Sequence, residues 1–110
     1  MKQYVIDEFR RSDSKKIQSY IKEKFESSGF DNLYWIPLDP NILTDVQASH
    51  TECQPFYFAI EIESERISCE LLVRTRNRVK CSCINYATEK QRNWLVDRVD
   101  NLLMELSIKI

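Results

Sequence analysis

The stretch PFYFAIEIESERISCELLVRTRNRVKCSCINYA, residues 55–87, decides the fold. Apolar and polar residues alternate through three consecutive runs, and a period of two is typical of strands buried on one side. The pattern therefore predicts a three-stranded antiparallel meander with one apolar face. The predicted inward side chains are Phe56, Phe58, Ile60, Ile62, Ile67, Cys69, Leu71, Val73, Val79, Cys81 and Cys83.

The register follows from keeping these apolar residues on one face, because a slip of one residue would turn every side chain over. A two-residue turn at 64–65 and a three-residue turn at 75–77 satisfy this condition. The first hairpin is predicted to pair Ile62 with Ile67, Ile60 with Cys69, Phe58 with Leu71 and Phe56 with Val73. The second is predicted to pair Val73 with Val79, Leu71 with Cys81 and Cys69 with Cys83.

Helical patterns flank this stretch. An apolar stripe over 13–28 predicts a helix capped by Ser12 or Asp13, with Gly29 at its C-cap. Thr88 and Gln91 fit a capping box that opens a longer helix, which runs to about residue 107. The stripe residues are Ile17, Tyr20, Ile21 and Phe25 in the first helix, and Leu95, Val99, Leu102, Leu103 and Leu106 in the second.

Three shorter elements complete the expected fold. Residues 3–9 and 33–36 are predicted to be short strands, and Asp39-Pro40 opens a short helix over 40–50 with Ile42, Leu43 and Val46 inward. We expect a single α+β domain over residues 1–110. Its three-stranded meander, or four-stranded sheet if the N-terminal segment joins, packs against the long C-terminal helix and the N-terminal helix.

Composition limits the classes of function. Sixteen basic and seventeen acidic residues give a net charge of −1, which disfavours a general nucleic-acid coat protein. No apolar run is long enough for a signal-peptide core or a membrane span, so we expect a soluble cytoplasmic protein.

The four cysteines, Cys53, Cys69, Cys81 and Cys83, allow two interpretations. The predicted register brings Cys69, Cys81 and Cys83 together, and His50 or Cys53 would supply a fourth zinc ligand. However, the sequence has no Cys-x₂₋₄-Cys knuckle, and the neighbouring positions of the predicted ladder are apolar. We therefore expect four reduced thiols that act as small core residues, with no metal and no cofactor.

Two surfaces are candidate binding sites. The basic run Arg74, Arg76, Arg78 and Lys80 is a candidate anion-binding hairpin, with a solvated strand edge as the alternative. On the sheet face opposite the core, Tyr57, Leu72, Ile84 and Tyr86 form a partly apolar strip. Another part of the chain, a second copy or a protein partner must cover this strip.

Signatures of catalysis are scarce. One glycine excludes a Gly-rich phosphate loop, and the single histidine, His50, has no paired nucleophile in the sequence. We expect a non-enzymatic protein-binding or adaptor module that self-associates, without catalytic residues. The alternatives are a nucleic-acid-associated protein that uses Arg74–Lys80 and a metal-dependent enzyme that uses Glu61, Glu63 and Glu70, with Lys80 nearby.

Overall fold

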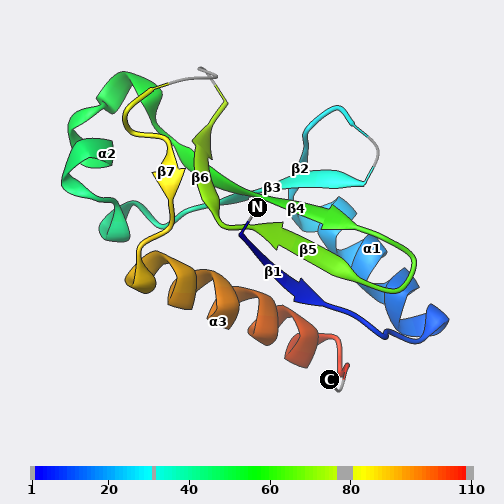
Figure 1. Cartoon of the computed structure of the whole chain (residues 1–110). Coiled ribbons are helices and arrows are strands. Elements are labelled where there is room, and N and C mark those ends of the chain that lie inside the picture. The colour runs from blue at the N-terminus through cyan, green and yellow to red at the C-terminus, as the bar shows by residue number, and fades with distance from the viewer. Residues whose placement is uncertain (1, 31, 77–80, 109–110) are drawn as a thin grey trace.

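A computed structural model describes residues 2–30, 32–76 and 81–108 (Figure 1). These residues form the predicted α+β fold, but with seven antiparallel strands in place of three or four. The strands are β1 (Gln3–Ile6), β2 (Glu26–Ser27), β3 (Leu33–Pro37), β4 (Phe56–Ile62), β5 (Ile67–Glu70), β6 (Leu72–Thr75) and β7 (Asn85–Tyr86). The helices are α1 (Arg11–Lys24), α2 (Asp45–Ser49) and α3 (Glu89–Glu105), with 3-10 turns at Pro40–Ile42 and Thr51–Cys53.

Strand β4 is central, and the strand order is β1-β5-β4-β3-β2, with β6 also paired to β4 and β7 paired to β6. The β4–β5 register is as predicted, with Ile60 opposite Cys69. The predicted pair Phe56–Val73 is wrong, because Phe56 lies opposite Thr75. Leu71 separates β5 from β6, which both pair with β4, and its amide donates to the Lys2 carbonyl. This shift of two residues changes the pairing and leaves the inward faces unchanged.

The predicted third strand of the meander forms only at Asn85–Tyr86, as β7, and its predicted register is wrong. Cys69 lies beside Tyr4 of β1 instead of Cys83, and β7 pairs Tyr86 with Leu72. The Tyr-Val-Ile run of β1 supplies an apolar edge strand, which leaves residues 81–84 to turn, with the Ile84 amide donating to the Cys81 carbonyl. The predicted partner of Val73, Val79, lies outside the described residues.

One hydrophobic core lies between the sheet and helices α1 and α3. The inward side chains of β4 are all buried, and Trp94 of α3 stacks on Phe58 with ring centroids 6.3 Å apart. The capping box of Thr88 with Gln91 opens α3 as predicted. Helix α1 ends at Lys24, earlier than predicted, because the residues after it pair with β3. None of the described helices is long and apolar enough to cross a membrane.

The segment predicted as one helix over 40–50 is two short pieces. Thr44 forms a second capping box with Gln47, so α2 starts afresh after the 3-10 turn. This new start rotates the inward face: Val46, predicted to be buried, is 47 % exposed, and Gln47 is buried in its place. The difference places a buried amide where the sequence pattern predicted an aliphatic side chain.

Candidate metal centre

Two pairs of metal-binding side chains meet at one end of the molecule, where α2 and the chain leading into β7 lie side by side (Figure 1). His50 and Cys53 come from the C-cap of α2 and the end of the following 3-10 turn. Cys81 and Cys83 come from the turn before β7. The four ligand atoms all lie within 4.8 Å of one another, and Cys81 Sγ is 3.2 Å from His50 Nδ1.

The spacing of these atoms is close to that of a tetrahedral site. With Zn–S bonds of ~2.3 Å, ligand atoms around a tetrahedral zinc lie ~3.8 Å apart. The widest separation in the cluster is 4.8 Å, so side-chain movements of about 1 Å would complete the coordination. Within the described ranges, this is the one group of three or more His, Cys, Asp or Glu side chains so arranged.

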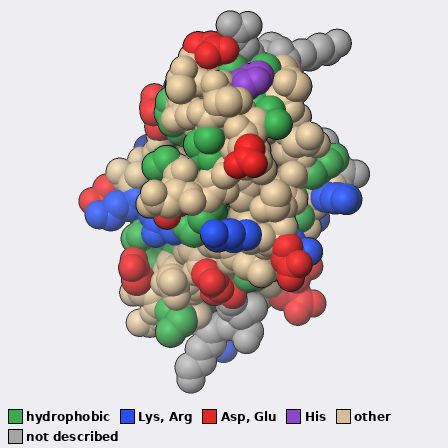
Figure 2. Space-filling view, turned by 90° about the vertical axis from the view of Figure 1, so that its left-hand side faces the viewer, with side chains coloured by type: hydrophobic (Ala, Val, Ile, Leu, Met, Phe, Trp, Pro, Cys, Tyr) green, Lys and Arg blue, Asp and Glu red, His purple; other side chains and the backbone are tan. Residues whose placement is uncertain are grey.

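The cluster is closed on its inner side and open on its outer side. Cys53 and Cys83 are buried, whereas His50 and Cys81 are partly exposed. Figure 2 shows the histidine, in purple, at the surface near one end of the molecule. An ion from solvent therefore has a route to the four ligands, and two of the ligands are held by the protein interior.

Buried hydroxyl and amide groups fix the main chain of both inner ligands. The Thr75 hydroxyl donates to the Cys53 carbonyl at 2.6 Å, and Gln47 Nε2 donates to the Cys83 carbonyl at 3.3 Å. The Cys53 amide also donates to the His50 carbonyl, which closes the turn that brings the first pair together. Such supporting bonds orient the ligands before a metal arrives.

The thiols of the centre differ in acidity. Hydrogen bonds from the backbone and side chain of Cys83, then from His50 and Cys53, lower the pKa of Cys81 to about 6. Burial raises the pKa of Cys83 to about 12, and hydrogen bonds to Cys81 and Cys53 act in the same direction. The lowered pKa of Cys81 favours its thiolate, the form that binds metal and reacts as a nucleophile.

Part of this set was predictable from the sequence. The predicted cluster contained Cys69, which is instead fully buried among Tyr4 and Ile60, and burial raises the pKa of its thiol to about 12. Both His50 and Cys53 belong to the centre, although only one of them was expected as a fourth ligand. The spacing His50-x₂-Cys53 is the signal that was missed: it is knuckle spacing with histidine as the first ligand.

The basic run does not form a free anion-binding patch in its described part. Arg74 is ion-paired with Glu70, and Arg76 is ion-paired with Glu26 at 2.7 Å. The Arg76 guanidinium also lies over the Tyr57 ring, 5.6 Å from its centroid. Arg78 and Lys80 lie outside the described residues.

Two of the three glutamates proposed for a metal-dependent enzyme are paired with arginines. Glu63 accepts two hydrogen bonds from Arg66, and Glu70 is paired with Arg74. A hydrogen bond with Glu63 raises the pKa of Glu61, and desolvation adds to this shift. Among the described residues these carboxylates do not form a group placed to hold a metal ion.

The strip on the far face of the sheet is present in part. Tyr57 and Leu72 lie on that face and Tyr86 is exposed, but Ile84 packs against the core because residues 81–84 turn. Trp35 adds to the strip, with its ring centroid 5.9 Å from that of Tyr57. A hollow of about 540 Å³ lies on this face, and it is lined by Gln3, Ser28, Phe30, Leu33, Trp35, Ala59, Glu61, Glu63, Arg66, Ser68, Glu70 and Arg74.

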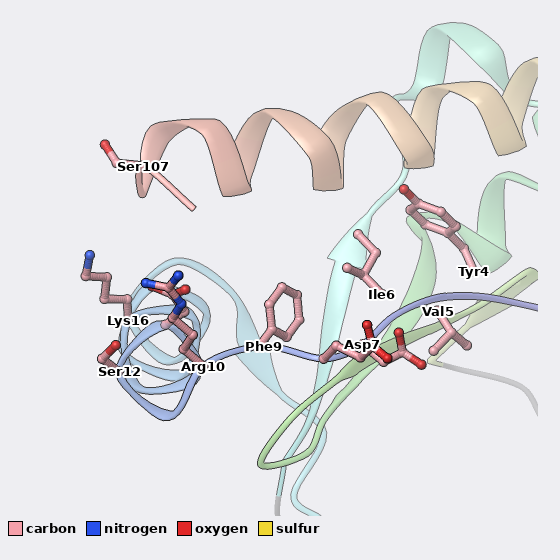
Figure 3. Close-up of a pocket in the computed structure, with 11 residues that line it drawn as sticks. Tyr4, Val5, Ile6, Asp7, Phe9, Arg10, Ser12, Lys16 and Ser107 are labelled. Atoms are coloured by element: carbon pink, nitrogen blue, oxygen red, sulfur yellow. The ribbon is translucent and has the colours of Figure 1, made fainter. Parts of the chain in front are cut away.

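A second hollow, of about 790 Å³, lies between β1, the start of α1 and the end of α3 (Figure 3). Ile6 and Phe9 form its apolar side, and Arg10 and Lys16 lie at the α1 end. Asp7, Glu8 and Asp13 also line it, so basic and acidic groups are mixed and no metal-binding group converges in its described lining.

Comparison with protein families, curated proteins and solved structures finds no match to this chain. Thiolate ligands favour soft or borderline metals, and a tetrahedral set of cysteine and histidine is typical of zinc.

Proposed function

We propose that this chain is a zinc-binding domain in which His50, Cys53, Cys81 and Cys83 hold one zinc ion. The observation that carries the proposal is the convergence of four suitable ligand atoms within 4.8 Å, from two segments far apart in sequence. Packing alone would bury a cysteine, but it gives no reason for a histidine and three thiols to meet.

The zinc would be structural. Four protein ligands fill a tetrahedral coordination shell, whereas a catalytic zinc keeps one position for water or substrate. The ion would tie α2 and the 3-10 turn after it to the turn at residues 81–84 before β7. This role supports a non-enzymatic domain, which agrees with the scarcity of catalytic motifs.

The test is metal content with matched cysteine variants. Wild-type protein should carry about one zinc per chain by elemental analysis, and Co²⁺ substitution should give the absorption bands of a tetrahedral thiolate site. Cys53→Ala should lose the metal. Cys69→Ala is the control, because it removes an equally buried thiol outside the centre. Wild-type protein that binds neither zinc nor cobalt would overturn the proposal.

A second candidate function, self-association, is favoured by the open sheet face. Phe30 is 75 % exposed at the rim of the 540 Å³ hollow, whose floor includes Leu33 and Trp35. An exposed ring at a partly apolar hollow is self-complementary, so a second copy related by two-fold symmetry would place each Phe30 against Leu33 and Trp35 in the other copy's hollow. Phe30→Ala should abolish dimers in sedimentation, and a wild type that is monomeric at high concentration would refute this candidate.

A further inference from the structure

A pair of buried glutamines, Gln47 in α2 and Gln91 in α3, connects the candidate metal centre to the start of α3. Gln47 is 2 % exposed and Gln91 is fully buried, although neither side chain is apolar. Gln91 Nε2 donates to Gln47 Oε1 at 2.9 Å and to the Ile42 carbonyl at 3.0 Å. Gln47 Nε2 in turn donates to the carbonyl of Cys83, one of the four ligands.

The direction of this chain of hydrogen bonds is fixed by two helix caps. The Thr88 amide donates to Gln91 Oε1 at 3.1 Å, and the Thr44 amide donates to Gln47 Oε1 at 3.0 Å. A backbone N–H can only donate, so each amide oxygen must face its own cap. Each amide nitrogen must then face an acceptor, and for Gln47 that acceptor is the Cys83 carbonyl. Neither side chain can flip without leaving buried polar groups unpaired.

We infer that Gln47 and Gln91 are positioning residues for the metal centre, and that they couple metal binding to the first turn of α3. This inference rests on the proposed zinc site. Outer-shell groups that orient metal ligands commonly change metal affinity by ~10–100-fold when they are removed, and Gln47 would orient Cys83 through its main-chain carbonyl. Because coupling is reciprocal, zinc should in turn stabilise the start of α3.

The ordinary alternative is that the two glutamines serve only their capping boxes. Substitutions in the chain separate the two roles. Thr44→Val removes the hydroxyl that caps α2 but leaves the Gln47 amide to hold Cys83. Gln47→Glu does the reverse: it keeps an acceptor for the Thr44 amide and for Gln91, since glutamate also serves capping boxes. It turns the donor toward Cys83 into an acceptor.

The first measurement is zinc affinity by competition with a chromophoric chelator. Gln47→Met and Gln47→Glu should each bind zinc ~10–100-fold more weakly than wild type, and Thr44→Val should bind within a few-fold of wild type. Co²⁺ spectra should shift in the Gln47 variants and stay unchanged in Thr44→Val. Equal affinities in all four proteins would overturn the inference while leaving the zinc site itself intact.

The second measurement uses wild-type protein, so it does not depend on whether a variant folds. Hydrogen exchange of the Arg92 amide, which donates to the Thr88 carbonyl at the start of α3, should slow when zinc is added to wild-type protein. The Leu106 amide, at the other end of α3, is the internal control and should change less. Equal slowing at both ends would contradict the coupling, and no zinc binding at all would instead refute the proposed function.

Discussion

Removing zinc from the wild-type protein is the perturbation whose cost follows most directly from the structure. His50 and Cys81 lie 31 positions apart in the sequence, so a shared metal closes a loop of that length. The chain-entropy relation for such a cross-link gives ~3.7 kcal/mol of stabilisation at 25 °C. A domain of this size has an unfolding entropy of about 0.23 kcal/mol/K, so the melting temperature should fall by roughly 15 °C.

Calorimetry of zinc-loaded protein, before and after dialysis against EDTA, measures this difference. Cys69→Ala is again the matched control: its cavity should lower both melting temperatures alike and preserve the difference between them. The reasoning is refuted if the chelator leaves the melting temperature of the wild type within about 2 °C. Such a result would show that the thiols of Cys53, Cys81 and Cys83 act only as small packed side chains, as the alternation of apolar and polar residues in the sequence predicted.

Three further outcomes are expected. In metal-free protein, iodoacetamide should modify Cys81 before Cys69 and Cys83 by peptide mass spectrometry, because the pKa of Cys81 is lowered and burial raises those of the other two thiols; zinc should protect Cys81. Zinc affinity should rise with pH, because the buried Cys83 thiol, with a pKa of about 12, releases its proton on binding; calorimetry in buffers of different ionisation enthalpy counts that proton. Leu72→Glu, on the open face, should stay folded and lose self-association in sedimentation, and a variant that unfolds would instead place Leu72 in a covered core.

Local patterns predicted the parts of the fold that short segments determine. The β4–β5 register follows from alternation across a short turn, and the start of α3 follows from the capping box at Thr88. The placement of β1 beside β5 was not predictable in this way, because the edge of β5 at Cys69 could pair equally well with any apolar strand. The break at Leu71 depends on its hydrogen bond to Lys2, which is distant in the sequence.

The candidate metal centre also depends on contacts between distant segments, which local sequence patterns do not predict. Cys81-x-Cys83 stood out in the sequence, but the register assigned it the wrong neighbour, Cys69. The correct partners, His50 and Cys53, sit where Thr44 restarts a helix that the apolar pattern had continued. The cap at Thr44 therefore determines which side chains of this segment face inward. Hydrophobic periodicity alone does not detect such a cap.

The hydrogen bond from the Tyr4 hydroxyl to Asp100 Oδ1, 2.7 Å long, joins residues 96 positions apart. On a ribosome that adds ~5–20 residues per second, β1 emerges ~5–20 s before the part of α3 that holds it. Its other neighbour, β5, is also made long after it. During synthesis the Tyr-Val-Ile run of β1 therefore stays unpaired until β5 and α3 have been made. Nascent chains halted before α3 should be the forms that aggregate or recruit chaperones.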